Sequence, residues 1–293
     1  MSLAIFKKSC PNCKGDISSL RLKHGLPCYT CIKKPLAELI KEVKPNSVNA
    51  PKRVYYLLKQ NYTLKEYARY ARLLREVYKF RMLFKRTTGS DLWNAQIAWA
   101  KRALSGKSFA ILAPTGMGKT VFSIFLSIYF AQRNKKIYFV LPTSLLTKQV
   151  SEKFMEYLEK IDLGIKVAYY HSMLKKSEKE KQMENIKEGN FDILITTSMF
   201  LSRKFELLKE RRFDLIIVDD VDSFLKASKN VDKVLMLLGF PQDIIEKTFR
   251  LIDLRQELLR NARFKILTDN EVAEKQRELC YLESCWVLKL VRK

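Results

Sequence analysis

The chain has 293 residues, of which 47% are hydrophobic, and it carries 55 Lys and Arg against 31 Asp and Glu. This hydrophobic content excludes a disordered polymer and suffices for one large domain or two smaller ones. The net charge of +24 favours a polyanionic partner. No apolar run reaches the ~20 residues of a spanning helix, and the N-terminus lacks the apolar core of a signal peptide. We therefore expect a cytoplasmic protein that meets nucleic acid and no membrane.

Two pairs of cysteines stand in residues 1–35. Cys10 and Cys13 form one CxxC pair, and Cys28 and Cys31 form a second one after fourteen intervening residues. This separation is typical of tetrahedral zinc, and the metal would supply folding energy that so short a segment cannot gain from burial. We therefore predict a zinc finger with four cysteine ligands. The alternative is four reduced cysteines that bind no metal.

Residues 36–89 have a helical pattern in which Lys and Arg are interleaved with tyrosines. Such a surface suits nucleic acid, because cations neutralise phosphates and aromatic rings stack on bases. The same tyrosines could instead pack, together with leucines at helical spacing, against the rest of the protein. Both alternatives stay open, since the stems of Lys and Arg can pack while their charged ends stay in water.

Residues 90–240 alternate helical segments with short apolar runs, namely FAILA, IYFVL, DILIT and DLIIV. Runs of this length between helices predict buried strands. Their alternation with helices predicts an α/β fold, in which a parallel sheet is covered by flanking helices.

The stretch APTGMGKT follows FAILA and precedes an apolar helix, which is the context that a phosphate-binding loop requires. Gly116 and Gly118 allow the backbone amides to turn inward around phosphates, and the helix N-terminus adds donors. Lys119 would neutralise the outer phosphates and Thr120 would hold magnesium. The predicted nucleotide-binding residues are Ala113, Pro114, Thr115, Gly116, Met117, Gly118, Lys119 and Thr120. The alternative is a chance glycine-rich turn.

The acidic stretch VDDVD follows the apolar run of DLIIV, at the end of a predicted strand. Magnesium bound to phosphates needs a carboxylate from a neighbouring strand, and Asp219 can supply it alongside Thr120. Asp220 would orient or deprotonate the attacking water, where many nucleoside triphosphatases use glutamate. We therefore predict Lys119, Asp219 and Asp220 as catalytic residues. Without the phosphate loop, a solvated strand end would be an alternative interpretation.

The motifs APTGMGKT, PTSLLTKQ, TTSMFLSR and VDDVD occur in the order found in the first motor domain of superfamily 2 helicases. The CPNC…CYTC finger and the stretches WNAQIAWAKRALSGK and FDLIIVDDVDSFLKASKN resemble reverse gyrases more closely, over about residues 8–260. This resemblance implies a RecA-like ATP-binding motor domain at 90–240. A zinc finger at 1–35 and a basic helical connector at 36–89 would precede it, and a helical segment at 241–293 would follow.

The resemblance also implies roles for individual residues and partners. Gln96 would select adenine, so that the nucleotide is ATP. The residues implied to face the DNA backbone are Thr143, Thr196, Thr197 and Ser198. ATP binding and hydrolysis would drive duplex opening and positive supercoiling of DNA. The implied partners are double- and single-stranded DNA, a second motor domain and a topoisomerase region.

The sequence also departs from the family pattern. No Ser-Ala-Thr motif follows VDDVD, and neither a second motor domain nor a topoisomerase region follows in this sequence. We therefore expect a fragment, a split subunit or a truncated product that binds nucleotide weakly and hydrolyses it slowly or not at all. The alternatives are a separate superfamily 2 helicase subunit and a non-catalytic DNA-binding fragment.

Overall fold

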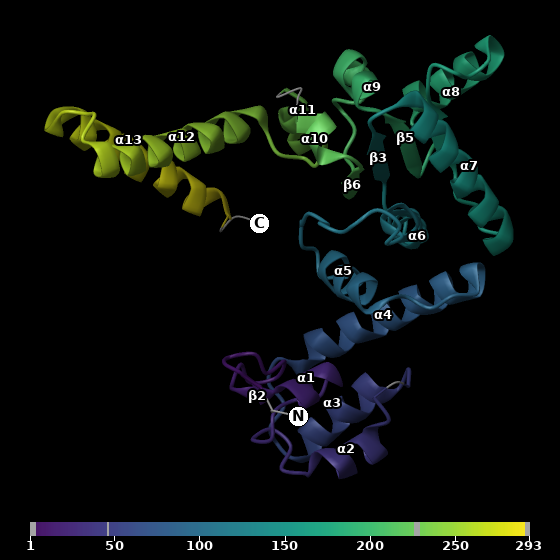
Figure 1. The fold of residues 1–293 in the computed structure, drawn as a ribbon, viewed down its shortest axis with the longest axis vertical. Coiled ribbons are helices and arrows are strands. Elements are labelled where there is room, and N and C mark those ends of the chain that lie inside the picture. Colours follow the sequence, from purple (N-terminus) through teal and green to yellow (C-terminus); the bar gives the residue numbers. More distant parts are fainter. Residues whose placement is uncertain (1–3, 46, 226–228, 291–293) are drawn as a thin grey trace. The chain divides into compact units, whose positions relative to one another are not determined.

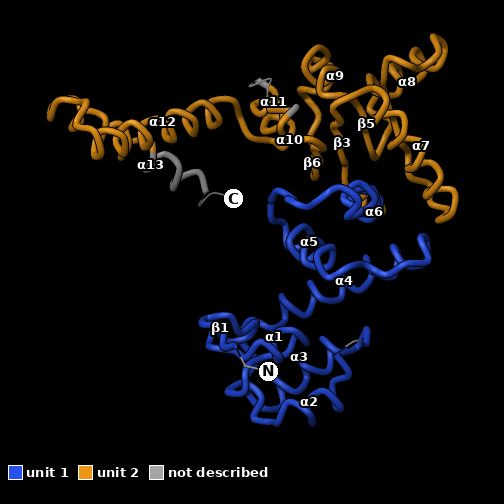
Figure 2. Tube along the Cα trace, viewed as in Figure 1, with its two compact units in different colours: residues 1–129 blue, residues 130–293 orange. Residues whose placement is uncertain are grey.

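The computed structural model describes residues 4–45, 47–225 and 229–290. They divide into two compact units, which Figure 2 colours separately: unit 1 spans residues 1–129 and unit 2 spans residues 130–293. No helix among the described residues is long and apolar enough to cross a membrane.

Unit 1 begins with a small hairpin and continues as helices (Figure 1). The antiparallel strands β1 (Ile5–Phe6) and β2 (Ile17–Ser18) form the hairpin. The helices are α1 (Ser19–Lys23), α2 (Leu36–Val43), α3 (Ala50–Gln60), α4 (Tyr67–Thr88), α5 (Asn94–Leu104) and α6 (Lys119–Ala131), whose last residues belong to unit 2.

The helix α4 buries two apolar patches along its 22 residues. Its buried residues are Tyr67 and Ala71 near its start, and Val77, Phe80 and Phe84 further along. Within each patch the spacing of three or four residues keeps the side chains on one side, whereas the two patches face different sides of the helix. The helix ends at Gly89, whose φ of 74° lies in the left-handed region that favours glycine. The first patch packs in the core shared with the finger, and Phe80 and Phe84 contact aromatic rings of α6.

A single core runs through the cysteine-rich segment and the helices that follow it. The buried members of this core are Cys10, Ile17, Leu26, Cys28, Cys31 and Ile32 from the finger, and Leu39, Val43, Ala50, Val54, Leu58, Tyr67 and Ala71 from α2, α3 and α4. The finger therefore does not pack alone: its apolar surface is buried against the connector.

Unit 2 is a parallel sheet covered by helices (Figure 1). Its elements are β3 (Ile137–Leu141), α7 (Ser144–Ile161), β4 (Val167–Tyr170), α8 (Lys176–Glu188), β5 (Ile193–Thr197), α9 (Ser198–Arg203), the 3-10 helix η1 (Phe205–Leu207), β6 (Leu215–Val218), α10 (Val221–Leu225), α11 (Lys229–Leu237), α12 (Gln242–Phe264) and α13 (Asp269–Leu290). The strand order is β4-β5-β3-β6, and every pairing is parallel. This sheet confirms the predicted α/β class.

One predicted strand is absent. The run FAILA at 109–113 belongs to neither sheet in the described part of the chain, and Leu112 is 95% exposed. A strand needs a backbone partner, and the partner is set by contacts far away in the sequence rather than by the apolarity of the run. The following helix α6 is apolar nearly all round and largely buried, as predicted.

Candidate functional site

The four predicted metal ligands come together in unit 1. The Sγ atoms of Cys10, Cys13, Cys28 and Cys31 all lie within 4.8 Å of one another. Three of the four side chains are buried, and Cys13 is half-buried. Four thiolates so close together repel one another, so they require a cation between them. A set of four sulfur donors fits zinc, which four thiolates hold in a closed tetrahedral site.

Hydrogen-bond donors point at these sulfurs. The Cys28 amide donates to Cys10 Sγ at 3.3 Å, the Gly15 amide to Cys13 Sγ at 3.3 Å, and Asn12 Nδ2 to Cys31 Sγ at 3.2 Å. Burial raises the pKa of Cys10, but hydrogen bonds with the backbone of Cys13, Cys28 and Asn12 outweigh it and bring this pKa to about 7. Burial raises the pKa of Cys28 and of Cys31. A cation bound to these two sulfurs would displace their protons and favour the thiolates.

A buried arginine supports the second cysteine pair. Arg21 is 5% exposed, and its guanidinium donates to the Pro27 carbonyl at 3.0 Å, to the Ile32 carbonyl at 3.4 Å and to the Lys34 carbonyl. Burial lowers the pKa of Arg21, whereas the neighbouring Cys28 raises it. The guanidinium stays charged, so it offsets the negative charge that four thiolates leave on a divalent ion. Nothing in the sequence separated Arg21 from the many other basic residues.

The phosphate loop in unit 1 has the backbone geometry that its glycines predict. Gly116 and Gly118 have φ values of 82° and 70°, and α6 begins directly after them at Lys119. Lys119 Nζ donates to the carbonyls of Ala113, at 2.6 Å, and Pro114, at 2.9 Å. The ammonium group is thus held within the loop, where a phosphate would meet it.

Gln96 contacts the phosphate loop from α5. Its side chain is 4% exposed, its Oε1 accepts from the Trp93 amide at 3.0 Å, and its Nε2 donates to the Gly118 carbonyl at 3.5 Å. A Cβ atom at Gly118 would lie 3.0 Å from that same Nε2, so the close approach also requires glycine there. The structure therefore brings the predicted adenine-reading and phosphate-binding residues together.

The two aspartates stand at the carboxyl end of β6 in unit 2. The Asp219 amide donates to the Val140 carbonyl at 3.0 Å, which continues the sheet ladder by one residue. Asp220 has a φ of 59°, and its carbonyl accepts from the Phe224 amide as α10 begins. Asp219 is half-buried and Asp220 is exposed. Thr120 belongs to unit 1, so the magnesium site shared by Thr120 and Asp219 stays a prediction.

The predicted DNA-facing residues lie where β3 and β5 end. Thr143 caps α7 by accepting from the Leu146 amide, at 3.2 Å, and Thr197 caps α9 by accepting from the Phe200 amide, at 3.1 Å. Leu141 pairs with Thr197 across the two strands, so both caps stand at one edge of the sheet, with Ser198 opening α9.

Thr196 lies in a different setting from the other three. Its side chain is fully buried, and its hydroxyl forms a 2.7 Å hydrogen bond with Tyr138 inside the sheet. Nearby, the hydroxyls of Ser144 and Ser172 form a 2.8 Å hydrogen bond beside the N-terminus of α7, a contact that their sequence positions did not indicate.

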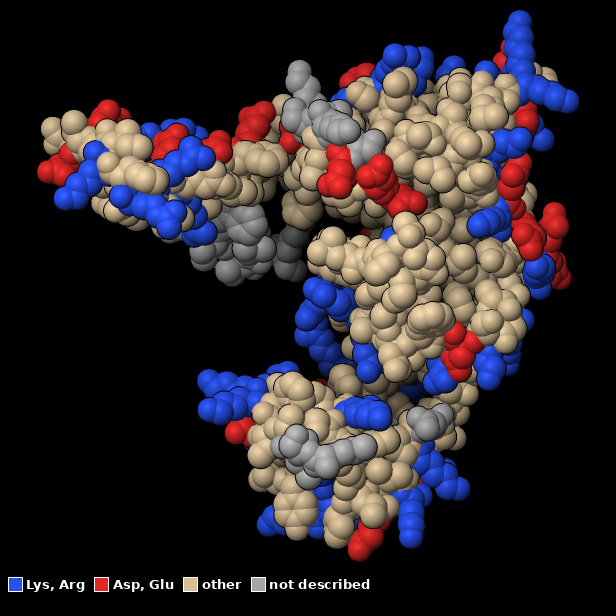
Figure 3. All heavy atoms as spheres, viewed as in Figure 1, with Lys and Arg blue, Asp and Glu red and all other residues tan. Residues whose placement is uncertain are grey.

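The connector buries some of its aromatic and aliphatic side chains and exposes most of its cations. Tyr67 is buried in the core, whereas Tyr62 is 97% exposed and Tyr56 is half exposed. The exposed cations of this segment are Lys41, Lys44, Lys52, Arg53, Lys59, Lys65, Arg69, Arg72, Arg75, Lys79, Lys85 and Arg86. Figure 3 shows Lys and Arg side chains over the outer surface of the molecule. The leucines and Tyr67 therefore pack, while the cations stay in water.

Two family models match the chain. The DEAD/DEAH box helicase model matches residues 93–250, and the reverse gyrase zinc finger model matches residues 1–50. This chain belongs to the DEAD/DEAH box helicase family. The RecA-like fold and the finger predicted from the sequence are thereby confirmed.

Curated relatives extend the match. Reverse gyrase from Pyrococcus horikoshii is 47% identical over 257 residues, which are 87% of this chain and 15% of that protein. Reverse gyrase from Pyrococcus furiosus is 44% identical over 261 residues, 87% of this chain and 21% of that protein. Reverse gyrase 1 from Aquifex aeolicus is 43% identical over 257 residues, 88% of this chain and 20% of that protein. The resemblance to the helicase-like part of reverse gyrase is confirmed, and the chain spans about a fifth or less of these relatives.

Zinc content tests the cysteine cluster. We expect about one zinc ion per chain, and we expect Cys31→Ser to lose most of it, because zinc needs all four sulfurs to close its shell. Cys280→Ser is the matched control, since Cys280 is exposed on α13 and remote in sequence from the finger. Metal analysis after gel filtration measures both. Equal zinc in the Cys31→Ser and Cys280→Ser proteins would refute the site.

Proposed function

We propose that this chain is the ATP- and DNA-binding helicase-like part of a reverse gyrase. In this proposal ATP binding and hydrolysis drive local opening of DNA and positive supercoiling, together with a second motor domain and a topoisomerase region. The observation that carries the proposal is the match of residues 1–50 to the reverse gyrase zinc finger in the same chain as the helicase match at 93–250.

The nucleotide site is proposed from the contact between Gln96 and the phosphate loop. Gln96 would read the adenine edge, and the amides of the loop with the N-terminus of α6 would bind the phosphates. Thr120 and Asp219 would hold magnesium, which neutralises charge on the transferred phosphoryl group when it is bound. Asp220 would orient the attacking water. Lys119 would exchange its two loop carbonyls for phosphate oxygens.

The DNA site is proposed from the carboxyl edge of the sheet and from the connector. The N-termini of α7 and α9 open at that edge beside Thr143, Thr197 and Ser198. Amides and hydroxyls at helix N-termini suit phosphates rather than bases, so the contact would be independent of sequence. Thr196, inside the sheet, would support Thr197 rather than touch DNA. Exposed cations of the connector would add affinity for single- and double-stranded DNA.

Nucleotide binding tests the first half of the proposal. We expect Lys119→Ala to weaken binding of ATP with magnesium by about 10–100-fold, the effect of losing a charge-assisted hydrogen bond worth about 1.5–3 kcal/mol. Lys107→Ala is the control, since Lys107 is an exposed lysine before the loop. Calorimetric titration of the purified chain measures the affinities. No affinity in the unmodified chain, or equal affinity in both variants, would count against an ATP site.

Salt dependence tests the DNA half. The affinity for a single strand falls as salt rises, and each phosphate contact adds about 0.7 to the steepness of log affinity against log salt. Replacing Arg72 and Arg75 by Ala should therefore make this slope shallower by about 1.4. The control replaces Lys176 and Lys181, exposed on α8, by Ala. Fluorescence anisotropy with a single-stranded oligonucleotide at several salt concentrations gives the slopes. If both double variants lower the slope alike, the connector has no special role.

A further inference from the structure

One buried side chain joins the cysteine cluster to the connector. Asn12 lies between Cys10 and Cys13 and has 0% exposure. Its Nδ2 donates to Cys31 Sγ at 3.2 Å and to the Thr63 carbonyl at 2.8 Å, and its Oδ1 accepts from the Lys65 amide at 2.8 Å. Both amide protons and the amide oxygen are therefore used, and two of the three bonds reach residues more than fifty positions away.

Two of the side-chain bonds of Asn12 end on the turn between α3 and α4, residues 61–66. The Asn12 carbonyl also accepts from the Glu66 amide at 3.1 Å, directly before α4 begins. Thr63 Oγ1 donates to the Cys31 carbonyl at 2.7 Å, so the same turn also holds the backbone of the second cysteine pair. We call Asn12, Cys31, Thr63 and Lys65 the finger–α4 joint.

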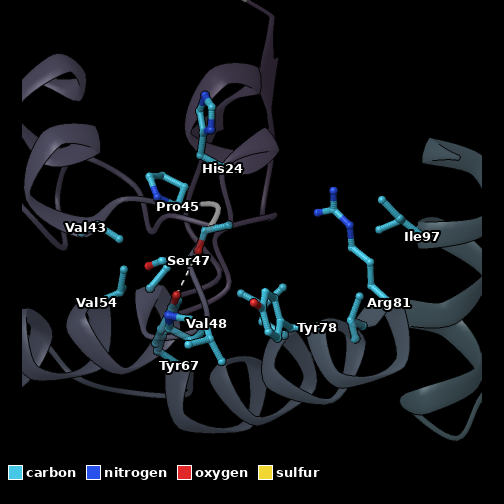
Figure 4. A pocket seen from close by; sticks show the side chains of 15 residues that line it. His24, Val43, Pro45, Ser47, Val48, Val54, Tyr67, Tyr78, Arg81 and Ile97 are labelled. Carbon is cyan, nitrogen blue, oxygen red and sulfur yellow. Dashed lines mark hydrogen bonds between the residues drawn. The ribbon is translucent and has the colours of Figure 1, made fainter. Parts of the chain in front are cut away.

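The packing around the finger–α4 joint also involves both the finger and α4. Tyr67, the first residue of α4, is fully buried and donates its hydroxyl to the Gly25 carbonyl at 3.0 Å. A pocket of about 120 Å³ lies beside it and is lined by His24 of the finger and by Tyr67, Tyr78 and Arg81 of α4 (Figure 4). The apolar core continues from the cysteines through α2, α3 and α4 without a break.

The bond from Asn12 to sulfur depends on where the sulfur of Cys31 is held. When zinc is bound, the metal fixes Cys31 Sγ within the cluster and within reach of the Asn12 amide. Loss of zinc removes the ligand bond that fixes this sulfur, and a shift of the sulfur leaves a buried amide proton without an acceptor. The side chain of Asn12 then loses its anchor at the cysteine cluster, and with it the support that it gives to the Thr63 carbonyl and the Lys65 amide.

We propose that Asn12 is a positioning residue that transmits zinc binding to the α3–α4 turn. Zinc then folds the finger, α2, α3 and the first turns of α4 as one cooperative unit, and not the finger alone. A residue that hydrogen-bonds to a metal ligand and holds that ligand's orientation raises the affinity for the metal by about 10–100-fold. Asn12 is expected to carry an effect of this size, and its loss is expected to uncouple α4 from the metal.

Hydrogen exchange of the unmodified full chain tests the coupling without any substitution. On removal of zinc with a chelator, we expect amide exchange to rise at least about tenfold both in the finger and in residues 57–71, the effect of losing about 1.4 kcal/mol of local stability. The strands of unit 2 serve as the internal control and should not change. Faster exchange confined to residues 10–32, with residues 57–71 unchanged, would overturn the proposal.

Variants then test the role of Asn12 itself. Asn12→Asp keeps the shape and the acceptor for the Lys65 amide. It replaces the Nδ2 donor, which serves both Cys31 Sγ and the Thr63 carbonyl, with a carboxylate oxygen, so zinc affinity should fall more than about 10-fold. The zinc affinity of the Asn12→Ala protein should fall by about 10–100-fold. Asn61→Ala, an exposed asparagine at the end of α3, should bind zinc as the unmodified chain does. Competition with a chromophoric chelator measures the affinities, and unchanged affinity in Asn12→Asp would overturn the proposal even if Asn12→Ala fails to fold.

Discussion

Repulsion among four sulfur atoms is the constraint on which unit 1 depends. The Sγ atoms of the finger lie within 4.8 Å of one another, and they cannot all ionise there without a cation. The cysteines are also members of the apolar core that continues into α2, α3 and α4. The metal site and the helical connector therefore fold around the same core. Asn12 joins the two segments, and Arg21 fixes the backbone around the second cysteine pair. The connector therefore presents most of its exposed cations on helices that contribute buried residues to this core.

In unit 2, the geometry of parallel strands determines where the predicted site residues lie. All strands of the sheet run in one direction, so their carboxyl ends and the helix N-termini that follow meet at one edge. Thr143, Thr197 and Asp219 come from the ends of β3, β5 and β6 and stand at this edge for that reason alone. Backbone donors gathered there suit phosphate groups, which is the chemistry that both a nucleotide and a DNA strand present.

The local motifs were predictable because their chemistry needs residues that are close in sequence. The CxxC pairs and the glycines of APTGMGKT predicted the sulfur cluster and the loop, and the structure has both. The missing strand at 109–113 was not predictable from its own residues, since pairing depends on distant backbone. Thr196 is buried because both faces of β5 are covered, so that Ile193 to Thr196 are all buried. The motif TTS does not reveal this. Nothing in the sequence marks Asn12, because two of its three side-chain partners lie more than fifty positions away.

The central claim is that Gln96 and the phosphate loop form an ATP site. Its most direct test is whether the chain discriminates between adenine and guanine nucleotides. A site that hydrogen-bonds one base rejects the other because the wrong base leaves buried polar groups unpaired. Calorimetric titration with ATP and with GTP, each with magnesium, should show at least about tenfold tighter binding of ATP, which requires a difference of about 1.4 kcal/mol. The preference should disappear in Gln96→Ala while phosphate-dependent binding remains. Equal affinity for ATP and GTP in the unmodified chain would contradict the account.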